Sequence, residues 1–326
     1  MSDKIFVRAE WGELKECIYG SSHEFIFPKW NVDSDLRPVG EFRQMWQSNP
    51  GRSLEDVNPD YFRNWKAQID GVVDFLENSG IKVHRGALIG EANRKFPDGD
   101  NWGSPTGWHR DGFVTIGNNV IELAPRTMFH RRQRFATRHI LVQTMERGAR
   151  YFAQPDCGGD QSVDAPGWGY LEGGDIFVLD KKILVGHSGH CSNPEGARWL
   201  QHMLGEEYSV ETVDVDPSCF QHLDCVLCTP REGVAIACTE AFPGGLPPYI
   251  SDWDIIDVSK QYCNDALGTN HLVINDQTVI VPAEEEHDWM EKELKKRRFE
   301  VVRLPYGYVY RCGGSFRCAH QPLIRL

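Results

Sequence analysis

The sequence predicts an α/β fold built from a repeated unit of hairpin, helix and strand. Pairs of short apolar segments are joined by turns of a few residues, a helical stretch follows each pair, and another apolar strand follows each helix. A doubly wound sheet fits less well, because helices rather than short turns would join its consecutive strands. Five such units would close around an axis as a five-fold pseudosymmetric α/β propeller. We expect residues 1–326 to form this propeller as a single domain.

The N-terminal region predicts a strand, a helix and a second strand. Residues 14–20 read as a short strand that ends in a turn, and residues 21–56 are expected to be irregular because prolines interrupt them. Asn58 is a typical helix cap and Pro59 a typical first helical residue. Apolar side chains then keep a helical spacing, and residues 81–83 follow as a strand.

The repeats themselves begin after residue 105. The predicted hairpins are residues 113–116 with 120–123, 176–179 with 183–185, 225–228 with 234–237, and 271–274 with 279–281. Helices are expected at 128–147, 194–204, weakly near 249–253, and at 283–297, and the closing strands at 149–152, 210–215, 255–258 and 300–304. The N-terminal strand, helix and strand, completed by the C-terminal segment, could make a fifth unit.

Composition and charge bound the class of protein. Hydrophobic residues make up 40% and charged residues 25% of the chain, as is typical of a soluble globular protein. The formal net charge of -12 argues against nucleic acid or an anionic membrane as a partner and is compatible with a cationic small substrate. No signal peptide and no apolar run of about 18 residues are found. We therefore expect a cytoplasmic protein whose ten cysteines are reduced.

Polar residues stand just before the first strand of each predicted hairpin and before the last strand of the chain. The segments are Trp108–Asp111, Glu172–Asp175, Gln221–Asp224, Asn264–Asn270 and Gly313–Cys318. Equivalent positions of a pseudosymmetric repeat lie at the same end of the molecule, near the axis. We therefore expect acids from three units, one histidine and one cysteine to converge.

Such a set suits a guanidinium substrate. Several carboxylates around one point repel each other unless a cation lies between them, and a planar guanidinium offers donors matched to carboxylates. Cys318 follows two glycines and Arg317, and a flanking arginine lowers a thiol pKa. The thiolate can add to the central carbon while His222 protonates the departing amine. The alternative for Cys318 is a buried core cysteine.

A metal site is the main chemical alternative. It would use His222, Asp224, Glu172 and Asp175. Zinc and iron prefer several histidine ligands, and this set offers one, so we expect no metal here.

Two further clusters have metal-like spacing. His187–Cys191 follows the second hairpin, away from the expected site, and favours a loop or surface role. Cys225 and Cys228 lie inside an apolar run and read as strand residues. No cofactor is expected either, because the chain has no phosphate loop and no Gly-x-Gly-x-x-Gly after a strand.

At these residues the chain resembles the guanidino-group-modifying enzymes of the pentein superfamily, from about residue 105 to the C-terminus. Arg110–Asp111 resembles the motif whose aspartate holds the guanidinium, and Glu172–Asp175 the acid-small-small-acid motif whose first acid pairs with the catalytic histidine. His222–Asp224 resembles the motif that supplies the general acid–base and a second guanidinium clamp. Cys318 matches the nucleophile near the C-terminus.

The resemblance implies a catalytic domain. The branches of the superfamily differ in the molecule that accepts the amidino group. Ser188–Leu200 and Gly313–Phe316 resemble amidinotransferases, which pass the amidino group of L-arginine or a related guanidine to an amine and release ornithine. Other features resemble hydrolases such as arginine deiminase, in which water is the acceptor and citrulline the product. These features are Arg317, Asn270–Val273 and the sequence Glu-Gly-Gly-Asp. We favour transfer, through a covalent amidino-Cys318 intermediate.

The resemblance also implies a role for each site residue. The catalytic residues are Cys318, His222 and Glu172, and the substrate-binding residues are Asp111, Asp224, Asp175, Asn270 and Arg317, where Asp175 either binds substrate or braces its hairpin. The expected partners are a small guanidine donor and an amine acceptor, and association into a homodimer stays open. A non-catalytic guanidine-binding protein would be expected to have lost the cysteine, the histidine or an acid, and all are present.

Overall fold

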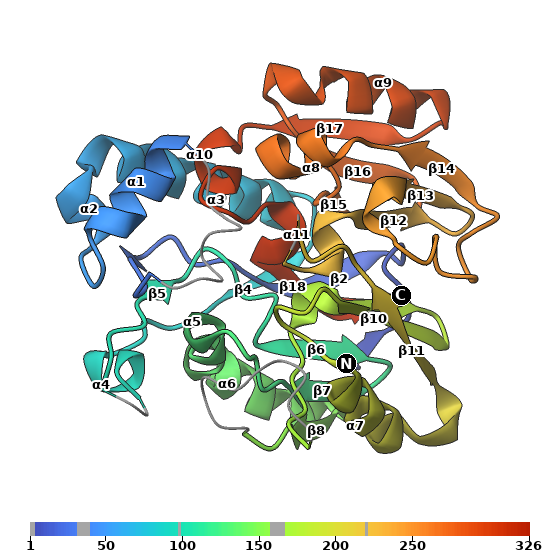
Figure 1. Cartoon of the computed structure of the whole chain (residues 1–326), viewed down its shortest axis with the longest axis horizontal. Helices are drawn as coiled ribbons and strands as arrows, with labels where there is room; N and C mark the ends of the chain where they lie inside the picture. Colours follow the sequence, from blue (N-terminus) through green and yellow to red (C-terminus); the bar gives the residue numbers. More distant parts are fainter. Residues whose placement is uncertain (1–3, 31–39, 97–98, 157–166, 219–220) are drawn as a thin grey trace.

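Small mixed sheets form the framework of this α/β protein (Figure 1). The computed structural model describes residues 4–30, 40–96, 99–156, 167–218 and 221–326. Four three-stranded sheets share one topology: the first two strands form an antiparallel hairpin, and the third runs parallel to the second. The predicted hairpins and closing strands are therefore confirmed.

The first two units match the predicted order of elements. They comprise β6 (Phe113–Ile116), β7 (Asn119–Glu122) and β8 (Arg150–Ala153), and β9 (Ile176–Leu179), β10 (Lys182–His187) and β11 (Ser209–Asp214). The single helix predicted over 128–147 is divided into α5 (Met128–Arg131), α6 (Gln133–Gln143) and the 3₁₀ turn η2 (Thr144–Arg147). Helix α7 (Pro194–Leu204), followed by η4 (Gly205–Glu207), begins as predicted, because the Asn193 side chain accepts a hydrogen bond from the Gly196 amide.

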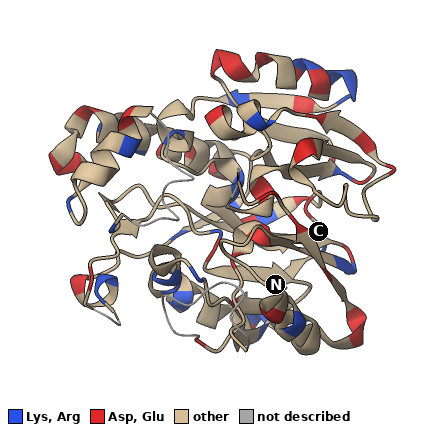
Figure 2. Ribbon diagram, viewed as in Figure 1, with Lys and Arg blue, Asp and Glu red and all other residues tan. Residues whose placement is uncertain are grey.

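The third and fourth units depart from the prediction in their helices. Their strands are β12 (Leu227–Arg231), β13 (Val234–Ala237) and β14 (Asp254–Asp257), then β15 (Leu272–Val273), β16 (Thr278–Pro282) and β17 (Glu300–Leu304). The helix predicted near 249–253 is wrong: prolines and glycines over 243–248 leave turns there, after η6 (Thr239–Ala241), and α8 (Lys260–Ala266) follows the closing strand instead. In the fourth unit, η7 (Glu285–His287) leads into α9 (Asp288–Lys296), which is acidic at its start and basic at its end (Figure 2).

The two ends of the chain complete a fifth sheet. Its order is β1 (Phe6–Val7), β18 (His320–Arg325), β2 (Leu14–Tyr19) and β4 (Lys82–Arg85). Strands β18 and β2 are antiparallel and β4 runs parallel to β2, which reproduces the repeated unit with α3 (Pro59–Asn78) as its helix. Short helices α10 (Gly307–Tyr310) and α11 (Phe316–Ala319) lead into β18. The expectation that the termini build one unit together is confirmed.

Residues 21–56 are more regular than the sequence predicted. They contain β3 (Phe25–Ile26), which pairs with β5 (Ser104–Pro105), and helices α1 (Gly40–Ser48) and α2 (Leu54–Val57); α4 (Glu91–Arg94) follows later. The Phe25 ring makes edge-on contacts with Phe27, Phe42, Trp65 and Trp108 at centroid distances of 5.3 to 5.9 Å. This aromatic packing orders the segment despite its prolines.

Over the described ranges the sheets are separate, and none closes on itself. No described helix is both long and apolar enough to cross a bilayer. Acidic and basic residues are interspersed along the ribbon (Figure 2).

Two neighbouring units approach each other closely at Gly173, and a substitution there tests this packing. A Cβ atom at this position would lie 2.0 Å from the Arg110 carbonyl oxygen, which belongs to the preceding unit. Gly173→Ala should therefore lower the free energy of unfolding by about 1–3 kcal/mol, as other overpacked sites do, measured by urea denaturation. Gly71→Ala is the matched control, because a Cβ atom at this position of α3 would meet no atom within 4 Å. This variant should raise the free energy of unfolding by up to about 1 kcal/mol, since alanine favours a helix over glycine. Equal stability of the Gly173 variant and wild type would contradict this packing.

Candidate active site

A pocket brings together residues that the sequence places far apart. Its empty space, with the open solvent at its mouth included, is about 550 Å³. Asp111, His222 and Cys318, each from a different unit, line it as predicted. Its other lining residues include Trp46, Pro105, Trp108, Phe129, His130, Gln221, Cys312 and the glycines Gly313 and Gly314. The lining thus combines charged and polar side chains with aromatic ones.

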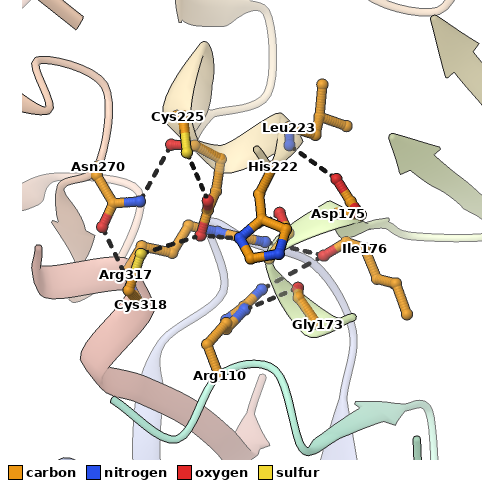
Figure 3. Close-up of polar contacts among 12 residues, drawn as sticks. Arg110, Gly173, Asp175, Ile176, His222, Leu223, Cys225, Asn270, Arg317 and Cys318 are labelled. Atoms are coloured by element: carbon orange, nitrogen blue, oxygen red, sulfur yellow. Dashed lines mark hydrogen bonds and ion pairs between the residues drawn. The ribbon is translucent and has the colours of Figure 1, made fainter. Parts of the chain in front are cut away.

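Cys318 is held from two sides at the start of the last unit (Figure 3). Its amide donates a hydrogen bond to the Asn270 side chain at 3.1 Å, and its Sγ lies 3.6 Å from Asp224 Oδ2. Asn270 in turn donates to the Asp224 carbonyl at 3.1 Å. The thiol is 7% exposed, on the wall of the pocket. This arrangement gives the sulfur a fixed position beside a carboxylate.

Glu172 is a buried carboxylate shared by two imidazoles. Its Oε2 lies 2.8 Å from His222 Nε2 and 2.7 Å from His130 Nδ1, while its Oε1 accepts a hydrogen bond from the Thr127 amide. Burial alone would raise the pKa of Glu172, but His130 and His222 outweigh it and hold that pKa well below its usual range. The predicted pairing of Glu172 with His222 is therefore present in the structure.

The pKa of His222 is raised. Burial alone would lower it, but Cys191, Asp111 and Glu172 raise it well above its usual range. His222 therefore favours the protonated form, which is the form that a proton donor needs.

Asp111 faces both imidazoles across the pocket. Its Oδ1 accepts a hydrogen bond from the Gly174 amide at 2.8 Å, and its oxygens lie 3.8 Å from His222 Nε2 and 3.6 Å from His130 Nδ1. Gly174 belongs to the turn η3 (Gly173–Asp175), and a Cβ there would lie 2.8 Å from the His222 ring. The small residue between the two acids of the motif therefore lets Asp111 and His222 come together.

Arg317 was predicted to contact substrate, and the structure places its side chain among buried protein partners. Its side chain is 3% exposed, does not line the pocket, and packs over the Phe177 ring at 3.8 Å. Its guanidinium lies 3.1 Å from Asp224 Oδ2 and 3.0 Å from Glu10 Oε1. Arg317 therefore positions Asp224, whose Oδ2 also lies 3.6 Å from Cys318 Sγ. Asp224 is itself fully buried in the turn η5 (Leu223–Cys225).

Asp175 and Asn270, which were also predicted as substrate contacts, lie outside the pocket lining, as Asp224 does. Asp175 is fully buried, and its two oxygens accept hydrogen bonds from the amides of Leu223 and Ser192. Burial raises the pKa of Asp175 to about 7. These contacts favour a structural role for Asp175, which holds its hairpin, over a role in substrate binding. Asn270 is occupied with Cys318 and Asp224, so it holds the nucleophile rather than the substrate.

Sequence reasoning missed His130, Glu10 and Trp46. His130 lies in α5, directly after the first hairpin, inside a run that was read only for its apolar spacing. A histidine placed one loop beyond Asp111 and among several arginines was the available signal. Glu10 precedes the first predicted strand and Trp46 lies in α1, where no repeat pattern points to the site.

One group of described residues has metal-like geometry, and it differs from the set that the sequence offered as the alternative to a guanidinium site. Single ligand atoms of Asp111, His130, Glu172 and His222 all lie within 4.8 Å of one another, and two imidazoles with two carboxylates could hold a divalent ion. Asp224 and Asp175 are not part of this group.

The other metal-like motifs do not assemble. His187 lies near Asp214 and His190 near the Pro217 carbonyl, whereas Cys225 and Cys228 are buried.

Comparisons with known proteins find relatives over most of the chain. A family model described as "N,N dimethylarginine dimethylhydrolase, eukaryotic" matches residues 65–325. The L-arginine:L-lysine amidinotransferase of Pseudomonas savastanoi pv. phaseolicola is 24% identical over 95% of this chain and 91% of that protein. A putative inosamine-phosphate amidinotransferase 2 of Streptomyces griseus is 26% identical over 96% and 94%.

Solved structures share the fold. The saxitoxin-pathway amidinotransferase SxtG of Microseira wollei superposes with a TM-score of 0.82 at 21% identity, covering 98% of this chain and 97% of that one. DDAH from Pseudomonas aeruginosa gives a TM-score of 0.62 at 16% identity, covering 95% and 99%.

The chain belongs to the family of the matched model and, with it, to the guanidino-group-modifying enzymes of the pentein superfamily.

Asp175→Asn separates bracing from substrate binding. An amide offers one acceptor oxygen where the carboxyl group serves two backbone amides, so one buried N–H loses its partner. Stability should fall by about 1–3 kcal/mol in urea denaturation. The KM for the guanidine donor should stay within a few-fold of wild type. Asp180→Asn, at an exposed turn, should change neither quantity. A large rise in KM at unchanged stability would show instead that Asp175 binds substrate.

The ion pairs of Glu10 make the free energy of unfolding depend on pH. Burial would raise the pKa of Glu10, but Arg317 and Arg110 outweigh it and lower the pKa from 4.5 to about 2. Because the folded-state pKa lies below the unfolded one, the stabilisation is complete above about pH 4.5 and is lost as the pH falls toward 2. The stability advantage of wild type over Glu10→Gln should therefore shrink by about 3 kcal/mol across that interval.

Urea denaturation at a series of pH values measures this advantage. Glu13→Gln, at an exposed neighbouring carboxylate, is the control and should show no comparable change. A difference between wild type and Glu10→Gln that is constant from neutral pH to pH 3 would contradict the assigned ion pairs.

Proposed function

We propose that the protein is an amidinotransferase that takes the amidino group of L-arginine, releases ornithine, and passes the group to an amine through a covalent amidino-Cys318 intermediate. The observation that carries the proposal is the meeting of Cys318, His222 and Asp111 at one pocket, with Asp224 3.6 Å from the sulfur. A planar cation between the carboxylates of Asp111 and Asp224 would relieve their repulsion and present its central carbon to Cys318.

The first half-reaction breaks a carbon–nitrogen bond of the donor. The Cys318 thiolate adds to the guanidinium carbon, and protonated His222 gives its proton to the departing nitrogen. The amine leaves, and a cationic S-amidino group remains on the sulfur. Glu172 stabilises the imidazolium before the transfer and orients its ring through the 2.8 Å contact. Asn270 and Arg317 act as positioning residues for Cys318 and Asp224.

The acceptor distinguishes transfer from hydrolysis. An amine regenerates the thiolate by attacking the amidino carbon, whereas water would give citrulline, as in the alternative function of an arginine deiminase-like hydrolase. The hydrolase is favoured by the description of the matched family model. Transfer is supported by the higher TM-scores, 0.82 and 0.81 against amidinotransferases and 0.61 to 0.63 against hydrolases. The aromatic wall of Trp46, Trp108 and Phe129 also favours exclusion of water.

We also propose that the five sheets are arranged about a pseudo-five-fold axis as one catalytic domain, residues 1–326. Each unit places one site residue just before its hairpin or last strand: Asp111, Glu172, His222, Asn270 and Cys318. The partners would be a small guanidine and an amine. The cytoplasmic location and the homodimer stay predictions.

The test is to incubate the purified protein with arginine, with and without a panel of amines (glycine, lysine, hydroxylamine and amino-cyclitols), and to separate ornithine from citrulline. We expect ornithine in amounts beyond one per site only with an amine, together with a new guanidino product. Intact-mass measurement should find the amidino adduct on wild type and not on Cys318→Ser. Citrulline formed without an amine would establish the hydrolase instead, and undiminished turnover by Cys318→Ser would exclude the covalent route.

A further inference from the structure

A second cavity lies apart from the pocket at Cys318 and takes no part in the proposed mechanism. Its empty space, with any open solvent included, is about 230 Å³, less than half that of the pocket at Cys318. Polar and charged side chains from both ends of the chain and from the third and fourth units line it: Glu10, Thr229, His271, Arg317, His320 and Arg325. The cavity therefore suits a small polar or charged ligand.

Arg325 brings a buried positive charge to this cavity with only neutral partners. Its side chain is buried, and its Nη1 donates to three backbone carbonyls at 2.7 to 3.1 Å. Its Nη2 lies 3.3 Å from His320 Nε2, which accepts because His320 Nδ1 donates to a backbone carbonyl. Over the described ranges no carboxylate forms an ion pair with this guanidinium. Burial lowers the pKa of Arg325 to about 10, so the group stays charged at neutral pH.

The neighbouring carboxylates are already committed to other arginines. Glu10 Oε1 lies 3.0 Å from Arg317 and 3.3 Å from Arg110, and Oε2 lies 3.2 Å from Arg317. Asp224 pairs with Arg317 at 3.1 Å. Together with Arg325, this network places three guanidinium groups against two carboxylates. Its net charge is positive, and burying an uncompensated charge is unfavourable.

Thr229 adds an unpaired hydroxyl to the same cavity. Its side chain is 1% exposed, on strand β12, and its Oγ1 has no hydrogen-bond partner among the described residues. A buried hydroxyl of this kind needs a ligand or a water molecule. His271, which also lines the cavity, adds no charge, because burial lowers its pKa to about 3. The cavity thus has a cationic donor and an unpaired neutral one, the two groups that hold an anion.

We propose that this cavity binds one small monovalent anion of the halide class, such as chloride, between the Arg325 guanidinium and the Thr229 hydroxyl. Among the described residues Arg325 Nη2 contacts only His320, so its second hydrogen is directed to the anion together with that of Thr229. One negative charge brings the network to neutrality. A water molecule would satisfy Thr229 and leave the charge of Arg325 uncompensated. Because Arg317 lines the cavity and holds Asp224, the anion stabilises the ion pairs beneath Cys318 without touching substrate.

Urea denaturation in chloride and in gluconate tests the proposal. Sodium chloride replaces sodium gluconate from zero to about 0.5 M at constant ionic strength, so that the screening of charges stays the same. Only the folded state has the site, so bound chloride multiplies the ratio of folded to unfolded protein. We expect this ratio to rise about tenfold when chloride reaches ten times its Kd, with a log–log slope approaching one ion per molecule.

Two matched variants locate the effect. Thr229→Val removes the hydroxyl that faces the cavity. Thr115→Val is the control, because the Thr115 hydroxyl is also buried and unpaired within the described chain, on the first strand of another unit, and does not line this cavity. We expect Thr229→Val to raise the Kd for chloride about tenfold or more, the scale for a lost hydrogen bond to a charged group. Thr115→Val should keep the wild-type Kd.

Crystals of the wild-type protein grown in sodium bromide show the ion directly. We expect an anomalous peak between Arg325 and Thr229. Equal stability in chloride and gluconate, or no peak in this cavity, would mean that it holds water only and would overturn the proposal. An equal chloride response of the two threonine variants would place the ion elsewhere and overturn it too. If Thr229→Val does not fold, the wild-type titration and the bromide peak decide. Neither threonine belongs to the proposed mechanism, so the outcome does not depend on the proposed function.

Discussion

A buried network of charges beneath Cys318 is the constraint on which the rest of the structure depends. Arg317 joins Asp224 of the third unit to Glu10 near the N-terminus, and it also donates to the Ile176 carbonyl of the second unit at 2.9 Å. Arg110 of the first unit reaches Glu10 at 3.3 Å. Both ends of the chain and three of the units thus meet at one set of ion pairs.

Buried charges of this kind specify an arrangement more than they add stability. Taking each ion out of water costs several kcal/mol, and the loss of one partner leaves an uncompensated charge that costs about 3–5 kcal/mol. Every unit that contributes to the network must therefore be in place before any of them is satisfied. Because Arg317 precedes Cys318 in the chain, the same pairs that join the units also fix the start of α11 and the sulfur that it carries.

The sequence predicted the repeat and the phase of the polar residues well, because both follow from local patterns. Hairpins are marked by apolar alternation and short turns, and a shared position before a hairpin implies a shared end of the molecule. What it could not predict was which polar residues face the pocket. Asp175 and Arg317 carry the same local signal as Asp111 and Cys318, yet they turn into the interior, where partners from other units satisfy them. Such pairings are long-range, and no spacing along the chain encodes them. His130 and Trp46 were missed for the same reason, since each reaches the site through packing of a helix rather than through the repeat.

Residues at repeat positions and residues outside them serve two different parts of the proposed chemistry. Asp111, His222 and Cys318 come from repeat positions, and in the proposed mechanism they cleave the donor in the same way whether water or an amine follows. Trp46, Pro105 and Phe129 come from α1, β5 and α5, which lie outside the repeated hairpins and line the same pocket. Residues outside the repeat can vary without disturbing the ion pairs that hold the units together. A family model described as a hydrolase and relatives that are amidinotransferases both match this chain. In the proposed mechanism the shared core sets the covalent step, and the residues around it set the acceptor.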